Sequence, residues 1–253
     1  METQVRQSPK KPHITSYDEN VARALADVES VVRPKPKKTN GAHRPLVVAS
    51  GFALLAFGGL FINWTAHRVD RQMRNEIFIQ AQMVAQAVDF RNVTALSGTQ
   101  ADLTSPDYQR LKEQLTLIRK ANPKCRFIYL MGRRADGKIF FYVDSEDPDS
   151  PDYSPPGETF DEATKDDYAV FTTGTGNANG GPYKDRWGVW ISAMVPVFHP
   201  DTQKQLAVLG MDFNAASWKW DVASKTTLPA ASSALAFLLG LYLLAVPVRV
   251  AWR

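Results

Sequence analysis

Two long apolar runs without charge dominate the hydrophobic pattern of the chain. Leu46 to Ile62 is the first and Leu228 to Val248 is the second. A helix needs roughly 20 apolar residues to cross the hydrocarbon core of a bilayer. Neither run has the polar stripe that a core helix usually shows. The pattern therefore predicts transmembrane helices at residues 45–64 and 227–248, with one segment, 65–226, between them.

After the first run, apolar residues keep a helical period. Met73, Ile77, Val84 and Val88 recur near 3.6-residue spacing, with charged residues between them. This spacing predicts that the first span leaves the membrane as one continuous helix and ends near Leu96. A helix of this kind is suited to transmitting movement across the membrane.

Two further helices and four strands follow. The helices are expected over residues 105–121, where Ser105 stands in the N-cap position before Pro106, and around residues 160–171. Alternating apolar and polar positions then predict strands at Arg126–Met131, Lys138–Asp144, Gly188–Val197 and Gln205–Phe213. The predicted fold class is α+β, with a long N-terminal helix, an antiparallel sheet and helices on one face of it.

The charge distribution orients the chain in the membrane. Cationic residues exceed acidic ones by four in residues 1–44 and by two in residues 227–253, whereas residues 45–226 carry two more acidic residues than cationic ones. The positive-inside rule then puts both termini in the cytoplasm and residues 65–226 outside. Trp64, Trp218 and Trp220 flank the apolar runs, as expected of an aromatic belt. The basic excess lies outside the folded segment, which argues against nucleic-acid binding.

The basic tail, residues 1–44, is rich in Lys, Pro, Ser and Thr. This composition predicts disorder, apart from a short helix at Tyr17 to Val32. In the second apolar run, small residues recur every four positions at Ser232, Ala236 and Gly240, which favours close packing with another helix. We therefore expect a homodimer as one of the possible assemblies of the chain.

Several classes of chemistry find no support in the residues. A single cysteine, Cys125, excludes an internal disulfide and a cysteine-based zinc site. The histidines form no visible set of nucleophile, base and orienting group. The acidic loop after Asp144 lacks the glycine and the terminal glutamate of an EF-hand calcium loop. We therefore expect no enzyme activity, no metal and no cofactor.

The glycine-rich stretch TTGTGNANGGPY, from Thr172 to Tyr183, is not a phosphate-binding loop. It joins a helix to a strand and lacks the Lys-Ser/Thr pair of that motif. We interpret it as a flexible loop over a binding pocket.

Five stretches mark the segment from Arg126 to Trp220: FIYLM, DGKIFFYVDSE, DYSPPG, GPYKDRWGVWISAMVPV and LAVLGMDF. With these stretches the segment resembles the single Cache (PDC, PAS-like) sensor domains of bacterial membrane receptors. The resemblance implies a PAS-like sheet, an extracytoplasmic ligand and a bacterial inner-membrane location. Such domains usually drive a histidine kinase, a diguanylate cyclase or a chemotaxis module after the second span. Here only Arg249 to Arg253 follow that span, so we expect a truncated receptor or a separate signalling partner.

Asp212 is the first candidate for ligand binding. It shares one face of its strand with Leu206, Val208 and Gly210, and an unpaired carboxylate among apolar residues is costly. The alternative is a strand-end Asp that caps the next turn. The resemblance adds that the carboxylate of this last strand contacts bound amines in the family, and Gly210 would allow close approach.

Two more candidates lie on the neighbouring strands. Asp144 ends its strand in line with Phe140 and Tyr142, or else belongs to a solvated acidic loop. Tyr129, on the face of Phe127 and Met131, has an apolar ring and a polar tip for a ligand, although core packing is the more common role of such a residue.

A run of aromatic and charged residues enters the third predicted strand: Tyr183, Asp185, Arg186, Trp187 and Trp190. Arg186 would clamp a ligand carboxylate, and Tyr183 would close over it. The alternative is a surface pair between Arg186 and Asp185. Together these residues predict a small zwitterionic or carboxylate ligand, such as an amino acid.

Two functions from different classes follow. The first is a membrane-anchored sensor that binds a small extracellular ligand and signals to a partner, with no role in nucleic-acid binding. The second is a two-span structural or assembly protein whose outer domain docks another membrane protein.

Overall fold

The computed structural model describes residues 16–32 and 43–245. The chain divides into two compact units, residues 1–53 and residues 54–253. Helix α1 (Ser16–Val32) belongs to the first unit and confirms the short helix predicted within the tail. The rest of the tail before residue 43 and the segment 246–253 lie outside the described residues, so their predicted disorder and charge placement stay predictions.

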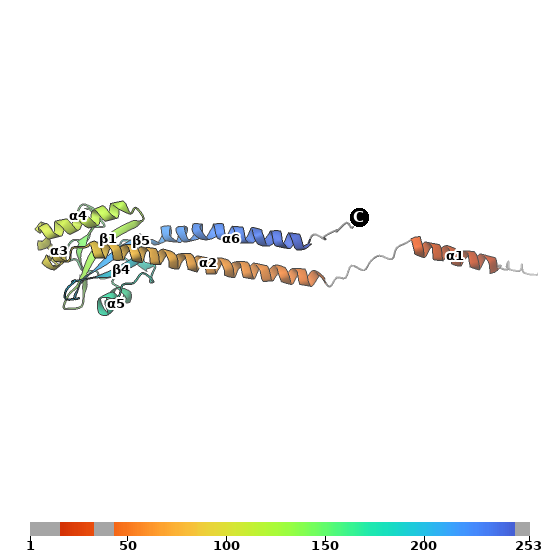
Figure 1. The fold of residues 1–253 in the computed structure, drawn as a ribbon, viewed down its shortest axis with the longest axis horizontal. Coiled ribbons are helices and arrows are strands. Elements are labelled where there is room, and N and C mark those ends of the chain that lie inside the picture. Colours follow the sequence, from red (N-terminus) through yellow and green to blue (C-terminus); the bar gives the residue numbers. More distant parts are fainter. Residues whose placement is uncertain (1–15, 33–42, 246–253) are drawn as a thin grey trace, which may run out of the picture. The chain divides into compact units, whose positions relative to one another are not determined.

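Helix α2 (His43–Ala87) carries the first apolar run into the second unit (Figure 1). Its segment Ala49–Ala87 is the one stretch, within the residues described, that is long and apolar enough to cross a membrane. The second predicted span coincides with the C-terminal half of α6 (Ala215–Ala245), where several side chains, including Ala236 and Gly240, are not described. The second span and the small-residue stripe therefore stay predictions.

The uninterrupted helix predicted to Leu96 is wrong, because α2 ends at Ala87. A separate short helix, α3 (Phe90–Ala95), begins after Asp89. The Asp89 carboxylate accepts a hydrogen bond from the backbone N–H of Arg91 at 3.0 Å. An Asp in this position caps a new helix by satisfying a free backbone donor. The apolar spacing continues across this break and therefore concealed it.

Capping residues determine where the helices in the middle of the chain begin and end. After the 3₁₀ helix η1 (Gln100–Thr104), α4 (Pro106–Ala121) begins at its N-cap Ser105, which confirms that prediction. Helix α5 (Lys165–Thr173) starts later than predicted, because Thr164 and Asp167 form a reciprocal capping box. It ends at Gly174, whose φ of 62° is readily adopted by glycine.

The five strands form one antiparallel sheet in the order β2-β1-β5-β4-β3. Four of them confirm the predicted strands, and the two-residue β3 was not predicted. Their bounds are β1 (Cys125–Arg133), β2 (Ile139–Asp144), β3 (Tyr183–Lys184), β4 (Val189–Phe198) and β5 (Gln205–Asn214). The central strand β5 is flanked by β1 and β4, and it leads directly into α6.

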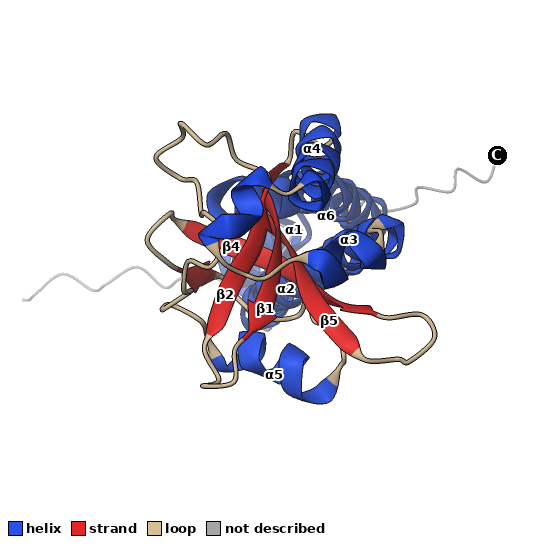
Figure 2. Ribbon diagram, turned by 90° about the vertical axis from the view of Figure 1, so that its left-hand side faces the viewer, coloured by secondary structure: helices blue, strands red, loops and turns tan. Residues whose placement is uncertain are grey.

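Helices cover both faces of the sheet, so the prediction that they all lie on one face is wrong. One hydrophobic cluster joins α2 and α4 to the sheet through residues such as Ile77, Leu111 and Leu209. A second cluster joins Val170 of α5 to Val208 on the other face. Figure 2 shows α4 and α5 on opposite sides of the strands. Alternation within the strands exposes apolar residues on both faces, and each face needs a cover.

Two irregularities in the sheet change which residues share a face. A register shift in the β1–β2 pair places Leu130 opposite Val143 but Met131 opposite Phe141. As a result Phe140 and Tyr142 do not share the face of Asp144, contrary to the prediction; Phe141 does. A second shift, near Phe198, places Leu206 against the helix-side cluster instead of in line with Val208. An extra residue in one strand inverts the alternation beyond it.

Candidate ligand-binding site

The antiparallel register brings the two leading carboxylates to one face of the sheet. Phe127 of β1 lies opposite Asp212 of β5, and Tyr129 of β1 lies opposite Asp144 of β2. Directly opposed residues in neighbouring strands project from the same face. Because β1 lies between β2 and β5, Asp144 and Asp212 therefore flank the same pair of aromatic rings.

A small cavity of about 20 Å³ lies at this position. Its lining combines acidic and aromatic side chains: Phe127, Tyr129, Phe141, Asp144, Asp152, Ser154, Phe160, Asp185, Trp187 and Asp212. Five of the eight predicted site residues are among them: Tyr129, Asp144, Asp185, Trp187 and Asp212. A volume of this size has room for about one water molecule.

Asp212 is buried, with a side chain positioned by its neighbours on β1 and β4. The Tyr129 hydroxyl donates a hydrogen bond to Asp212 Oδ1 at 3.2 Å. Burial raises the pKa of Asp212 to about 7, although hydrogen bonds from Ser192 and Tyr129 oppose the rise. Burial likewise raises the pKa of Tyr129, so its hydroxyl stays a donor. The Asp212 carboxyl thus changes its charge near neutral pH.

Gly210 explains how Tyr129 reaches this carboxylate. A Cβ atom at Gly210 would lie 2.1 Å from Cε2 of the Tyr129 ring. The ring therefore lies across β5 where only a glycine leaves space. The close approach predicted at Gly210 is thus used by a side chain of the protein itself.

Asp144 is buried and does not belong to a solvated loop. Its Oδ1 accepts from the Glu146 N–H at 3.0 Å, and its Oδ2 accepts from the Ser154 N–H at 2.9 Å. Burial raises the pKa of Asp144 to about 6, against the lowering effect of these two hydrogen bonds. The carboxylate therefore also holds the acidic loop against the sheet.

Asp185 is fixed by three donors on one oxygen atom. Its Oδ1 accepts from the backbone N–H groups of Trp187 at 2.8 Å and Gly188 at 2.9 Å, and from Trp190 Nε1 at 2.9 Å. Trp190 does not line the cavity. Its ring packs edge-on against Phe127 with centroids 5.0 Å apart, so it supports the wall from behind.

The structure places Arg186 and Tyr183 outside the cavity. Arg186 forms ion pairs with Glu158 at 3.1 Å and Glu162 at 3.5 Å, and its guanidinium carbon lies 4.1 Å from the Trp187 ring centroid. The Tyr183 hydroxyl donates to Asp166. Neither the predicted surface pair with Asp185 nor the carboxylate clamp describes Arg186, because acidic residues of a distant loop occupy its guanidinium.

The glycine-rich stretch contacts α2 and contributes no residue to the cavity lining. Arg74 of α2 is buried and donates through Nη1 to the carbonyl oxygens of Ala178 at 3.1 Å and Gly180 at 2.6 Å. The residues that do reach the cavity, Asp185 and Trp187, follow the stretch directly.

Sequence reasoning missed half of the lining. Simple alternation along the strand puts Phe141 on the other face, because the sequence does not reveal the register shift, and it gives Phe127 only as a neighbour of Tyr129. Phe160, Asp152 and Ser154 come from the irregular segment after β2. Irregular loops have no period from which their inward-facing residues can be read.

The lining has an unusual charge balance. Four of its ten side chains are carboxylates and none is cationic. Asp152 is paired with Arg126 at 2.6 Å, whereas Asp144, Asp185 and Asp212 form no ion pair among the residues described. Trp187 packs edge-on against Phe141 with centroids 5.9 Å apart, which adds to the aromatic wall. Carboxylates and aromatic faces both attract cations, so the arrangement suits a positively charged group.

No family model and no curated protein match the chain. Solved structures do. The ligand-binding domain of the Campylobacter jejuni chemoreceptor Tlp3 in complex with L-valine matches with a TM-score of 0.46 and 12% identity, over 70% of this chain and 66% of that chain. The same domain with 4-methylisoleucine matches with a TM-score of 0.45 and 10% identity, over 74% and 65%.

The sensory domain of Tlp3 with isoleucine bound matches with a TM-score of 0.44 and 11% identity, over 70% and 65%. This chain thus spans slightly less than two thirds of the length of each Tlp3 domain. All three of these solved structures are ligand-binding or sensory domains of one chemoreceptor.

Proposed function

We propose that this chain is a membrane-anchored sensory module whose outer domain binds a small molecule with a protonated amine. One observation carries the proposal: a cavity with aromatic walls contains four carboxylates and no cationic side chain. An ammonium group would pair with the carboxylates and lie against the ring faces.

Burying the charged carboxylates without a cation to pair with them destabilises the protein. Asp144 and Asp212 have pKa values raised by burial, which means that their charged forms are disfavoured there. A bound cation would restore the favourable pairing that burial removes. Clusters of perturbed carboxylates in one cavity are typical of functional sites.

The small cavity implies that binding involves movement. About 20 Å³ holds one water molecule and no amino acid. Phe160 and Trp187 enter the cavity from two loops, and these loops must move outward to admit a ligand. A ligand that favours the open arrangement shifts the population toward it, which is the change that a sensor must report.

The proposed ligand differs from the zwitterion expected from the sequence. Arg186 is already paired with Glu158 and Glu162, so the cavity offers no cation to a ligand carboxylate. We infer that the amine is the group recognised and that a carboxylate on the ligand is dispensable.

The proposed output runs through α6. Asp212 lies near the end of β5, and α6 begins at Ala215. Asn214 Oδ1 accepts the N–H groups of Ala216 at 2.9 Å and Ser217 at 3.1 Å, so the strand continues into the helix through a capped junction. We propose that movement at Asp212 reaches α6, crosses the inner membrane and acts on a kinase, a cyclase or a second copy of the chain. The proposal is for binding and signalling without catalysis.

The test uses the full chain in phosphatidylcholine nanodiscs and measures thermal unfolding. The panel contains isoleucine, its decarboxylated form 2-methylbutylamine, its deaminated form 3-methylpentanoate, the amine putrescine, and the quaternary ammonium ion choline. At least one amine should stabilise the protein, by about 2.7 kcal/mol at a hundredfold excess over its Kd, whereas 3-methylpentanoate should not.

Asp212→Asn should abolish this stabilisation because it removes the buried charge. Asp201→Asn, at an exposed position in the β4–β5 turn, is the matched control and should retain it. The proposal fails if no amine stabilises the wild-type chain, if the deaminated acid is as effective, or if Asp212→Asn responds as the wild type does.

A further inference from the structure

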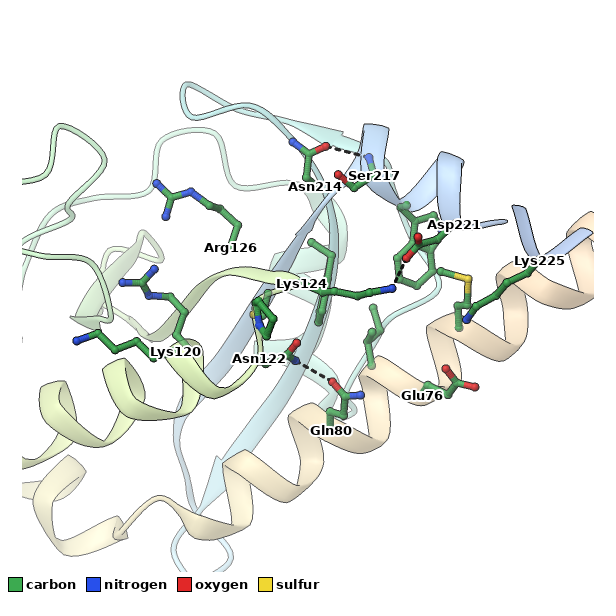
Figure 3. A pocket seen from close by; sticks show the side chains of 17 residues that line it. Glu76, Gln80, Lys120, Asn122, Lys124, Arg126, Asn214, Ser217, Asp221 and Lys225 are labelled. Atoms are coloured by element: carbon green, nitrogen blue, oxygen red, sulfur yellow. Dashed lines mark hydrogen bonds and ion pairs between the residues drawn. The ribbon is translucent and has the colours of Figure 1, made fainter. Parts of the chain in front are cut away.

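A second and much larger hollow lies on the other face of the sheet. It has a volume of about 650 Å³ and is lined by α2, by the residues that join α4 to β1, and by the junction of β5 with α6. We call it the junction groove (Figure 3). Its volume lies in the range of small-molecule sites, roughly 300 to 1,000 Å³. It shares no lining residue with the cavity around Asp212.

The floor of the junction groove is apolar. Met73 and Ile77 of α2, Phe213 of β5 and Trp218 of α6 line it, and each is less than 8% exposed. The Phe213 and Trp218 rings pack edge-on with centroids 6.3 Å apart. An aromatic or acyl group of a ligand would lie against this floor, and its removal from water would favour binding.

The rim of the junction groove is predominantly basic. Its charged lining residues are the cations Arg119, Lys120, Lys124, Arg126 and Lys225 and the anions Glu76 and Asp221. In Figure 3, Lys120 and Arg126 lie at one side of the groove and Lys225 lies at the other. A hollow bordered by an excess of one charge concentrates ions of the opposite sign.

Some of these cations are already paired. Lys124 forms an ion pair with Asp221 at 2.5 Å, and Arg126 and Arg119 both pair with Glu146, at 2.5 Å and 3.1 Å. In the described parts of the chain, neither Lys120 nor Lys225 has an ion-pair partner, so two ammonium groups remain for an incoming anion.

We propose that the junction groove binds a small organic anion with an apolar body, such as an aryl or acyl carboxylate or phosphate. The apolar body would lie on the floor formed by Met73, Phe213 and Trp218, and the anionic group would lie at the basic rim. The inference goes beyond the proposed amine site, because it concerns another face, another set of residues and a ligand of opposite charge.

The anion can come from solution or from a lipid headgroup. If α2 spans the membrane as proposed, Met73 lies about 16 Å beyond Ile62 along the helix. The headgroup layer of one leaflet is only about 5 to 8 Å thick. The floor of the groove is therefore beyond the reach of a headgroup, whereas Lys225 of the rim lies only three residues before the second apolar run, so the experiment has to distinguish the two sources.

An occupied junction groove would influence α6. Ser217, Trp218, Asp221 and Lys225 all belong to the first turns of this helix, and α2 forms the opposite wall. An anion held between them would stabilise one arrangement of α2 and α6. The second ligand would thus bias the same helix that the proposed amine signal uses.

The experiment measures binding to the full chain in phosphatidylcholine nanodiscs by isothermal titration calorimetry. The probes are phenyl phosphate, benzoate and octanoate, with inorganic phosphate and phenol as the separate halves of the first probe. We expect saturable binding of at least one probe, at least fivefold tighter than either phosphate or phenol.

Ser217 provides a test of charge at one position. It is exposed on the rim, so Ser217→Glu and Ser217→Gln add side chains of similar size that differ in charge. Ser217→Glu should weaken probe binding at least threefold relative to Ser217→Gln, because the added negative charge at the rim repels the anionic group of the probe. The double variant Lys120→Gln/Lys225→Gln should bind the probe more weakly than the wild type and more weakly than Ser217→Glu. Lys204→Gln, in the β4–β5 turn, should bind it as tightly as the wild type.

The remaining outcomes either overturn or support the proposal. Binding of inorganic phosphate as tightly as phenyl phosphate, equal affinities of the two Ser217 variants, or no binding by any probe would overturn the proposal. Loss of binding only in nanodiscs containing phosphatidylglycerol would identify a lipid headgroup as a competing source of the same anionic chemistry and would support the site. Asp212→Asn should leave probe binding intact, so failure here and failure of the amine proposal are distinguishable.

Discussion

Single residues decide the electrostatics of the cavity around Asp212. Asp212 is 5% exposed and has no cationic neighbour in the lining, and its folded-state pKa is about 7. In an unfolded chain the pKa of an Asp is about 3.9. The folded protein therefore holds the Asp212 proton over a pH range in which the unfolded chain has already released it.

This difference predicts a loss of stability as the pH rises. Below about pH 4 both states are protonated, and the contribution of Asp212 is fully present. Between about pH 4 and 7 the unfolded state loses its proton first, so unfolding becomes easier, by on the order of 4 kcal/mol in total. Asp212→Asn removes this contribution. Thermal unfolding without ligand should show the wild type losing more stability than Asp212→Asn from pH 4.5 to pH 8.

Asp201→Asn is the control for this titration, because Asp201 is exposed. It should follow the wild-type pH profile. Parallel profiles of the wild type and Asp212→Asn would show that Asp212 is ionised in the folded protein at low pH, contrary to its buried environment.

At the scale of elements, a small polar cluster joins α2 to α6. The Trp218 indole Nε1 of α6 donates to Asp70 Oδ1 of α2 at 2.7 Å. Arg74 donates to the same carboxylate at 2.7 Å and also to the glycine-rich stretch. The cluster thus connects both helices to the segment that precedes Asp185 and Trp187.

Trp218→Phe should destabilise the sheet domain by about 1 to 2 kcal/mol. The change keeps an aromatic ring but removes a hydrogen bond to a charged acceptor. Trp220→Phe is a matched control in the same helix, because Trp220 is 75% exposed and should be neutral within about 0.5 kcal/mol. Urea unfolding of the three chains, followed by circular dichroism, provides the comparison. Equal midpoints for the two variants would show that the Asp70 contact contributes nothing.

At the scale of the whole molecule, the charge pattern and the two apolar runs predict the topology. The tail and the C-terminal end should be cytoplasmic, and the sheet domain should be outside. Among the residues described, only α2 meets the criterion for a membrane span, so the sides of the membrane on which the tail and the sheet domain lie are measured directly.

Cysteine labelling in intact cells measures this topology. Cys125 is 4% exposed and is the single native cysteine, so the unmodified chain should react little. Lys204→Cys, in the exposed β4–β5 turn, should react with a membrane-impermeant maleimide in intact bacteria. Ser8→Cys, in the tail, should react only after the membrane is permeabilised. The reverse pattern, or labelling of both, would contradict the proposed orientation.

Much of the local structure could be predicted from the sequence. Ser105 caps α4 as predicted, and the four alternating segments are strands, because caps and period-2 alternation act over a few residues. The break at Asp89 was missed, since the same Asp is compatible with a helix interior until its side chain turns to cap Arg91.

The binding site was predictable only in part. The sequence by itself determined that Asp212, beside Gly210 in an apolar strand, needed a partner or a pocket, because an isolated buried carboxylate is costly anywhere. Only the tertiary structure decided which residues meet it. The register shift put Phe141 on the cavity face, Glu158 and Glu162 engaged Arg186, and loop closure brought in Phe160. These outcomes depend on contacts between residues that are distant in the chain. The free energies of side-chain packing, strand pairing and ion pairing decide such contacts, and the local pattern of apolar and polar residues does not encode them.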